Sequence, residues 1–458
     1  MTTPSTPPAA TAPAPRLSAL PERAPWRVLD VTIAAISMYA AHRLSPTYLA
    51  DPTATPALQV SLVHVGAMLA AGHAVGLYEP AVARSRSLAR RRGVAAGTLA
   101  VLATLLFFYV VRYAPIGRWI AALGWLGTTG GVLLGRELAH RRGRAAPRVV
   151  LFVHEGPLVR ATVEALARVG DGAFRVLPPV HESASRDERA GERLRDLCAA
   201  GAVDDLVVPN AKDALEPWLR PALGCLELGC RLLTEADFYE EVLERVPVEH
   251  VPADWLLSRG WDTSDPWREV AKRATDVAIA LAVTPLALPL AAAAALAIRL
   301  DDRGPALFPQ RRIGRFGQPF TMWKLRTMKA GAEAGSARWT AAGDPRLTRV
   351  GRRLRVLRLD ELPQLLNVLR GEMSWVGPRP EQPEIVAELE RRIPYYAWRH
   401  QVRPGLTGWA QLKLPYASSV EEARHKLELD LYYIRHRSWW LDLGIVLRTV
   451  TSFARGAR

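Results

Sequence analysis

The chain has few of the residues that stabilise small secreted proteins, since only three cysteines occur among its 458 residues, at Cys198, Cys225 and Cys230. They are too few and too irregularly spaced for a disulfide framework or a metal cluster, so we expect reduced thiols in cytoplasmic surroundings. The first 26 residues are rich in Pro, Ala and Thr and lack an apolar core. Residues 1–26 are therefore predicted to form a disordered tail and not a cleaved signal peptide.

Acidic residues are also in short supply, with 45 Asp and Glu against 60 Lys and Arg, which gives a formal net charge of +15. Such a balance suits nucleic acid, an anionic membrane surface or phosphate-bearing substrates. The mean hydropathy is nevertheless close to zero although 23% of the residues are charged, so the apolar residues must be concentrated in blocks. These blocks favour a membrane and phosphates as partners, and no nucleic acid is expected.

Four apolar stretches follow the tail, near residues 28–48, 57–78, 94–111 and 118–135. The third and fourth contain uncharged runs close to the roughly 20 residues that a bilayer core requires. Buried helices of a soluble protein are the alternative, but four such stretches so close together favour a unit of four transmembrane helices over residues 27–146. Arginines gather before the first stretch, between the second and third, and after the fourth, which predicts that both ends of this unit face the cytoplasm.

Residues 147–250 have the pattern of a soluble α/β domain. Residues 148–153, 204–209 and 230–234 are predicted strands and residues 158–168 a helix, which favours a doubly wound parallel sheet and a Rossmann-like domain. The turn after the first strand, HEGP (154–157), lacks the G-x-G-x-x-G spacing that lets a backbone approach a pyrophosphate. A structural or regulatory spacer is therefore favoured over a dinucleotide site, and residues 251–268 are expected to form a linker.

A fifth apolar run, residues 277–298, contains 22 uncharged residues, enough to cross a membrane as a straight helix. Basic residues flank the run on both sides, as expected of a segment that returns to its starting side. Pro285 and Pro289 lie near its middle, where each removes a backbone donor and bends a helix. We therefore predict a re-entrant membrane helix over residues 272–299, with a full crossing as the alternative.

The pair Asp360–Glu361 is the strongest candidate for chemistry on the residues alone. Pro363 follows closely and leucines recur at helical spacing, so the pair is predicted in the first turn of an amphipathic helix, where the helix N-terminus favours ionised carboxylates. An ordinary acidic first turn is the alternative. The density of nearby cations instead fits a site for phosphates; they are Arg352, Arg353, Arg355, Arg358, Arg370 and Arg379.

Two further motifs accompany this pair. In GPRP (377–380), two prolines fix the backbone around Arg379, whose guanidinium suits bidentate binding of a phosphate. In PGLTGWAQ (404–411), two glycines permit a tight turn beside an aromatic ring and an amide that could engage uracil. The tryptophans and tyrosines of residues 395–440 suit either a core or amphipathic helices at a membrane interface.

The C-terminal part contains a dense series of special segments. They are KRATD (272–276), GPALFPQRRIGRFGQPFTMWKLRTM (304–328), DPRLTRVGRRLR (344–355), LDELPQLLNVLRGEMSWVGPRP (359–380), PGLTGWAQ and ELDLYYIRH (428–436). With these segments, residues 270–450 closely resemble the bacterial sugar transferases, which are monotopic polyprenyl-phosphate sugar-1-phosphate transferases. The preceding four-helix unit and Rossmann-like domain resemble the long form of that family. The resemblance implies a catalytic phosphoglycosyltransferase domain over residues 269–458.

The resemblance also assigns residues to roles. It implies that Asp360 is a nucleophile forming an aspartyl-phosphosugar, and that Glu361, with Asp360, holds Mg²⁺. Structural ion pairs with Glu372 or Glu381 are the alternative for the arginines of the site. The residues implied to bind phosphates are Lys324, Arg326, Arg355, Arg379, Lys272 and Arg273, and those implied to contact the nucleotide are Thr407, Gly408, Trp409 and Gln411.

The activity implied by this resemblance is transfer of a sugar-1-phosphate from a UDP-sugar to undecaprenyl (polyprenyl) phosphate, with release of UMP. It would initiate the synthesis of an exopolysaccharide, capsule or O-antigen on the cytoplasmic face of a bacterial inner membrane. Membrane lipids and a homodimeric partner are further expectations. A membrane-anchored nucleotide-sugar dehydratase and a non-catalytic scaffold for polysaccharide assembly are the alternatives, and the identity of the sugar stays open.

Overall fold

The structure is a computed structural model that describes most of the chain. Its described residues are 24–46, 57–78, 86–111, 118–141, 148–169, 174–180, 188–250, 265–302, 304–329, 346–414 and 419–454. Most of the predicted tail and of the predicted linker, 251–268, lies outside these ranges, so both stay predictions. The chain divides into two compact units between Phe238 and Tyr239, with the short segment Ala70–Gly76 grouped with the second.

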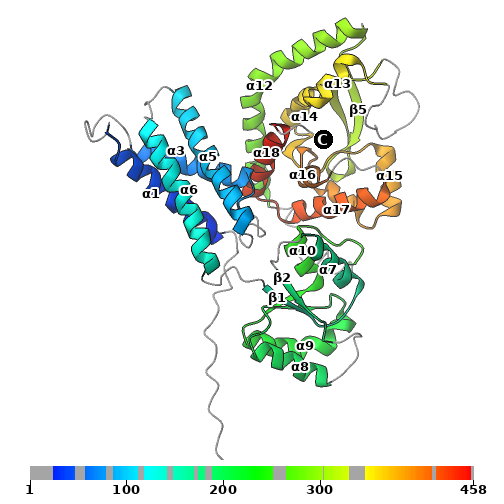
Figure 1. Cartoon of the computed structure of the whole chain (residues 1–458). Helices are drawn as coiled ribbons and strands as arrows, with labels where there is room; N and C mark the ends of the chain where they lie inside the picture. Colours follow the sequence, from blue (N-terminus) through cyan, green and yellow to red (C-terminus); the bar gives the residue numbers. More distant parts are fainter. Residues whose placement is uncertain are drawn as a thin grey trace, which may run out of the picture. The chain divides into compact units, whose positions relative to one another are not determined.

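Four long helices occupy the predicted membrane unit (Figure 1). They are α1 (Ala24–Arg43), α3 (Ala57–Ala74), α5 (Arg86–Val111) and α6 (Arg118–Arg141). Their apolar side chains pack together around Met38, Val101 and Phe108. The apolar stretches of the sequence therefore form helices, as predicted.

Three helices in the described ranges are long and apolar enough to cross a membrane, namely Ala57–Ala74, Ala89–Val111 and Pro266–Asp302. Neither α1 nor α6 is among them, and each contributes one member of a buried ion pair, in which Arg136 Nη2 lies 2.8 Å from Asp30 Oδ2. Polar side chains inside a helix bundle act as specific contacts between helices. That all four helices cross the membrane stays a prediction.

A four-stranded parallel sheet follows, with the strand order β2-β1-β3-β4. The strands are β1 (Arg148–Phe152), β2 (Phe174–Leu177), β3 (Asp205–Val208) and β4 (Arg231–Thr234). The helices beside them are α7 (Pro157–Val169), α8 (Glu188–Ala199), α9 (Lys212–Glu227) and α10 (Glu235–Leu243). Three strands and α7 match the predicted segments, whereas β2, a short edge strand, was not predicted. All three cysteines are free and buried in this part of the chain.

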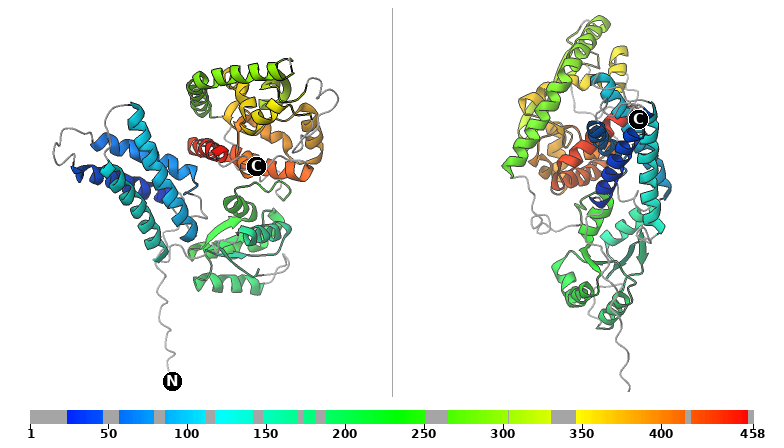
Figure 2. Two further views of the ribbon diagram at one scale, coloured as in Figure 1. Left: turned by 45° about the horizontal axis from the view of Figure 1, so that its top comes forward. Right: turned by 90° about the vertical axis from the view of Figure 1, so that its left-hand side faces the viewer.

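The C-terminal unit contains α12, a continuous helix of 37 residues over Pro266–Asp302 that changes direction along its length (Figure 1). Strands β5 (Leu307–Ile313) and β6 (Pro319–Leu325) form an antiparallel hairpin around η1 (Arg315–Gly317), and β7 (Ser374–Val376) pairs in parallel with β8 (Gly405–Thr407). Figure 2 shows α12 from two further sides. The remaining elements are α13 (Arg349–Val356), η2 (Leu359–Gln364), α14 (Leu365–Arg370), α15 (Pro383–Arg392), η3 (Tyr396–Gln401), α16 (Trp409–Lys413), α17 (Val420–Arg435) and α18 (Trp439–Ala454).

Candidate active site

The Asp360–Glu361 pair lies in η2, a 3-10 helix that leads directly into α14. The leucine spacing predicts that the pair lies in the first turn of a regular α-helix, and this prediction is wrong, because the turn is a 3-10 helix. Arg358, just before it, has a φ of 52°, so the backbone turns sharply as it enters the pair. Both carboxylates are largely withdrawn from solvent, with Asp360 only 9% exposed.

The environment of Asp360 disfavours its charge. Burial raises the pKa of Asp360 from 3.8 to about 6, and the neighbouring Glu361 carboxylate adds to the effect, while Lys324 and Arg355 oppose it. The carboxylate is therefore mainly ionised at neutral pH, although it is less stabilised than an exposed one. A weakly stabilised carboxylate is suited to act as a nucleophile towards a phosphorus atom.

Glu361 experiences the opposite balance. Burial alone would raise its pKa, but the charges of Arg379, Lys324 and Arg358 outweigh burial and lower the pKa of Glu361. Arg379 Nη2 lies 3.2 Å from Glu361 Oε1, and Arg358 Nη1 lies 3.8 Å from Oε2. Two adjacent carboxyls whose pKa values are pushed apart are typical of a division of labour in catalysis.

Lys324 reaches the pair from β6, and burial, together with the charge of Arg379, lowers the pKa of Lys324 to about 8. The strand is fixed to α14 by Asn367, a fully buried residue. Its Oδ1 accepts a hydrogen bond from Trp323 N at 3.2 Å, and its Nδ2 donates to Thr321 O at 2.7 Å and to Glu372 Oε2 at 2.6 Å. Asn367 thereby fixes the strand of Lys324 to the helix that follows the two carboxylates. Sequence patterns gave no sign of this role of Asn367.

Arg379 is positioned by its backbone as well as by Glu361. Gly377 N donates to Thr407 O at 2.9 Å and Gly405 N donates to Pro378 O at the same distance, which ties the GPRP turn to β8. Arg399, itself paired with buried Asp430 at 2.7 Å, donates from Nη2 to Arg379 O at 2.9 Å. The prolines were predicted to fix the backbone around Arg379, and three hydrogen bonds hold the same turn in place.

The other predicted phosphate ligands have protein partners. Arg326 pairs with Asp302 at the end of α12 and is 7% exposed. Arg355 Nε donates to Thr327 Oγ1 at 2.9 Å, while its charge still acts on Asp360. The structure thus brings Lys324, Arg355 and Arg379 towards the carboxylates, while Arg326 pairs with the end of α12, and its phosphate-binding role stays a prediction.

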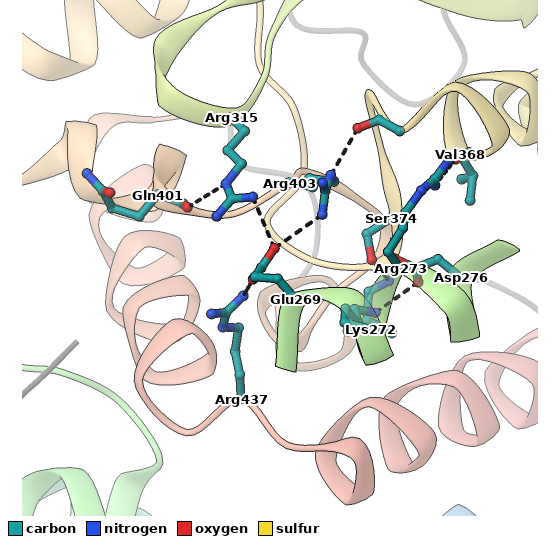
Figure 3. A network of polar contacts seen from close by, with 12 residues as sticks. Glu269, Lys272, Arg273, Asp276, Arg315, Val368, Ser374, Gln401, Arg403 and Arg437 are labelled. Carbon is teal, nitrogen blue, oxygen red and sulfur yellow. Dashed lines mark hydrogen bonds and ion pairs between the residues drawn. The ribbon is translucent and has the colours of Figure 1, made fainter. Parts of the chain in front are cut away.

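Lys272 and Arg273 are likewise engaged near the start of α12 (Figure 3). Lys272 Nζ lies 3.0 Å from Asp276 Oδ1 and 2.9 Å from Asp442 Oδ2. Arg273 donates to the carbonyl oxygens of Val368 and Leu369. These contacts hold α12 against α14 and α18, and a phosphate-binding role for either residue stays a prediction.

A second network at the same place was not predicted. The Glu269 carboxylate lies 3.0 Å from Arg315, 3.2 Å from Arg403 and 2.8 Å from Arg437, as Figure 3 shows. One acidic side chain in the first turn of α12 therefore joins η1, the segment before β8 and the connection between α17 and α18. Local spacing carried no signal for it, since the partners are 46, 134 and 168 residues away.

The predicted nucleotide motif divides into buried and site-facing residues. Trp409 is 4% exposed, and its Nε1 donates to Glu244 O at 3.3 Å, so the indole is a core residue and offers no open face to a base. Thr407 Oγ1 lies 2.7 Å from Thr449 Oγ1, and Gly408 passes so close to Gly377 that a Cβ would lie 2.2 Å from its oxygen. Gln411 Oε1 instead accepts from Arg379 Nη1 at 3.3 Å.

The donor set for a metal ion is small. Within the described ranges, no group of three or more His, Cys, Asp or Glu residues is placed to hold one. Asp360 and Glu361 offer adjacent carboxylate oxygens, the hard ligands that Mg²⁺ prefers, and Mg²⁺ commonly completes its coordination with waters and substrate phosphates. The residues therefore fit a magnesium ion that is bound together with a phosphate-bearing substrate.

Comparison with known proteins agrees with this chemistry. Residues 267–456 match the family described as bacterial sugar transferase. A UDP-glucose:undecaprenyl-phosphate glucose-1-phosphate transferase of Caulobacter vibrioides is 50% identical over 186 residues, which cover 40% of this chain and 70% of that relative. The chain belongs to the bacterial sugar transferase family.

Two other relatives of this bacterial sugar transferase extend the comparison. A UDP-N-acetylgalactosamine-undecaprenyl-phosphate N-acetylgalactosaminephosphotransferase of Aeromonas hydrophila is 39% identical over 267 residues, or 58% of this chain and 62% of that relative. A UDP-glucose:undecaprenyl-phosphate glucose-1-phosphate transferase of Escherichia coli is 41% identical over 181 residues, or 39% of each protein. The chain thus spans less than two thirds of both of these relatives.

Proposed function

We propose that this bacterial sugar transferase moves a sugar-1-phosphate from a UDP-sugar to undecaprenyl phosphate and releases UMP. The observation that carries the proposal is the buried Asp360, whose pKa is raised to about 6 beside Lys324 and the Glu361–Arg379 pair. The names of the relatives, which specify UDP-sugars and undecaprenyl phosphate, support the same substrates. They lend no support to a dehydratase or to a scaffold without activity.

The proposed reaction has two steps. An Asp360 carboxylate oxygen attacks the phosphorus that bears the sugar, the bridging P–O bond of the diphosphate breaks, and UMP leaves. A phosphate oxygen of the lipid then attacks the same phosphorus and restores the Asp360 carboxylate. No proton transfer to the carboxylate is needed in either step.

The other side chains manage charge in this scheme. Lys324 and Arg379 hold the negative charge that spreads over the phosphate oxygens during transfer. Glu361 keeps Arg379 oriented and, with Asp360, would hold Mg²⁺, which would supply positive charge to the diphosphate of the donor. Because Gln411 also contacts Arg379, the PGLTGWAQ motif contributes to the site through an amide and not through its indole.

The membrane arrangement is part of the proposal. Arg273 near the start of α12 bonds to α14, and Asp302 at its end pairs with Arg326 beside β6. Both ends of the helix are thus bound to one unit, which supports a re-entrant helix whose exposed leucines, such as Leu286 and Leu288, face lipid. The catalytic unit would then lie on the cytoplasmic face of the inner membrane.

The exposed Trp439 and Trp440, 57% and 40% accessible, support contact of α18 with membrane lipids. Tyr396, Tyr432 and Tyr433, in contrast, are core residues. The middle domain has the parallel sheet of a Rossmann-like fold, and we infer that it serves as a spacer or regulatory domain. A homodimer stays a prediction.

The test is a donor panel with purified full-length protein and undecaprenyl phosphate, in which UMP release is measured for UDP-glucose, UDP-galactose and their N-acetylated forms. At least one donor should give UMP and a lipid-linked sugar phosphate. With a donor labelled in its sugar and no lipid, label should remain on the wild-type protein but not on Asp360→Asn. Lipid product without any labelled protein in quenched reactions would point to direct transfer.

A further inference from the structure

A segment ahead of the matched family region lies against the catalytic unit. We call residues 239–250 the strap; they begin within α10, belong to the same compact unit as α12 to α18, and precede the match that begins at residue 267. Val246 and Val248 of the strap are 0% and 1% exposed. The strap is therefore an integral part of the catalytic unit and not a loose connection.

The first part of the strap is anchored to α17. Glu240 Oε2 lies 2.6 Å from Arg435 Nη1 and its Oε1 lies 2.8 Å from His436 Nε2. Farther along, Val246 N donates to Glu428 O at 3.0 Å. Because Glu240 and Arg435 are both at least nine-tenths buried, this pair is shielded from the solvent screening that weakens surface ion pairs.

Glu244 anchors the strap to α16 in two ways. Its backbone oxygen accepts the hydrogen bond from Trp409 Nε1 at 3.3 Å, and its carboxylate lies 3.2 Å from Lys413 Nζ. Glu244 has a φ of 56°, in the left-handed region that side chains other than glycine rarely adopt. Such a conformation persists only where surrounding contacts hold it, which indicates that these bonds are specific.

These two contacts of Glu244 are made to Trp409 and Lys413, the first and last residues of α16, a helix of only five residues. Gln411 lies between them and accepts from Arg379, whose other terminal nitrogen pairs with Glu361. The strap is therefore connected to the Glu361 carboxylate by polar contacts at both ends of a short path, with helix α16 itself as the middle of that path. Contiguous contacts of this kind can carry energetic coupling, which has to be shown by measurement.

We propose that Glu244 is a positioning residue, which sets the place of α16 and, through Gln411, the orientation of the Arg379 guanidinium towards the diphosphate of the donor. This inference rests on the proposed function, because Arg379 is assigned there to the transferred phosphate. It implies that the catalytic unit of this chain requires residues outside the matched segment. The chemistry itself still resides on Asp360.

The experiment is a double-mutant cycle with Glu244→Gln and Gln411→Ala, measured with UDP-glucose and UDP-N-acetylgalactosamine in the full-length protein. We expect Glu244→Gln to lower kcat/KM by about 2- to 30-fold. In the Gln411→Ala background it should have little further effect, since the connection to Arg379 is already broken. Glu249→Gln is the matched control in the same strap, because the Glu249 side chain is 42% exposed, and it should retain activity.

Additive losses in the cycle, or an equal loss in Glu249→Gln, would overturn the proposal in favour of a purely structural strap. Thermal unfolding of each variant separates the two, since a brace would lower stability without any coupling to Gln411. If Glu244→Gln does not fold, Lys413→Gln tests the same ion pair from α16. A wild-type protein inactive on every donor would instead refute the proposed function, so the two failures are distinguishable.

Discussion

Replacing Asp360 with Asn should abolish transfer and, at neutral pH, make the protein more stable. The loss of activity follows because an amide cannot act as the nucleophile, and turnover should fall by more than about a thousandfold. The gain in stability follows from burial. A buried carboxylate whose charge the fold disfavours lowers the free energy of unfolding, and its neutral analogue does not.

The size of this gain can be worked out from the pKa of Asp360, which is raised from 3.8 to about 6. The folded state therefore disfavours the ionised form by about 3 kcal/mol. This penalty is fully present above the folded pKa, shrinks as the pH falls through 6, and disappears below 3.8, where the carboxyl is protonated in both states. Asn carries no such penalty at any pH.

Thermal unfolding in one detergent at pH 7.5 and at pH 4.5 provides the assay. A change of 3 kcal/mol corresponds to a rise of about 6 to 12 °C in Tm for a domain of this size, which should appear at the higher pH and shrink to about a third at the lower. Glu388→Gln, whose side chain is 50% exposed, is the control and should change little at either pH. A destabilised Asp360→Asn protein at pH 7.5, or an equal gain at both values, would refute the reasoning.

Three further predictions concern the site and the membrane. The pH profile of kcat/KM should be bell-shaped, falling below about 6 as Asp360 is protonated and above about 8 as Lys324 loses its charge, and a flat profile from pH 5 to 9 would contradict it. Glu361→Gln should raise the Mg²⁺ concentration needed for UMP release and weaken Mn²⁺ binding measured by electron paramagnetic resonance, whereas unchanged values would argue against a ligand role. A cysteine placed by Ala387→Cys, at an exposed position of α15, should be shielded from a membrane-impermeant maleimide in intact cells. Replacing both prolines of α12 with Leu should make this cysteine accessible if the helix then crosses the membrane. Labelling of the cysteine without that replacement would refute the re-entrant helix.

Much of the fold could be predicted because local sequence patterns indicate its helices and strands. Runs of apolar residues correctly located α3, α5 and α12, and three short apolar segments located β1, β3 and β4. Strand β2 escaped because its four residues are only partly buried at the edge of the sheet and show no clear alternation. The 3-10 form of η2 escaped as well, since leucines at helical spacing do not reveal how tightly the backbone winds.

The site was predictable only as far as its residues are neighbours in sequence. Asp360 and Glu361 are adjacent, and the prolines around Arg379 mark it locally. Arg326, to which the family resemblance gives a phosphate-binding role, pairs with Asp302, 24 residues earlier, and its phosphate role stays a prediction. Which arginine meets a carboxylate and which meets a phosphate depends on contacts that only the folded chain brings together.

The hydrogen bonds of Asn367 bear on how the protein should respond to acid. Two hydrogen bonds between the Asn367 side chain, which does not titrate, and the backbone of Thr321 and Trp323 link the strand of Lys324 to the helix behind the carboxylates. The proposed nucleophile, Asp360, has its pKa raised to about 6, yet this link is the same above and below that pH. Acid should therefore abolish activity without unfolding the catalytic unit, and activity should return as soon as the pH is restored.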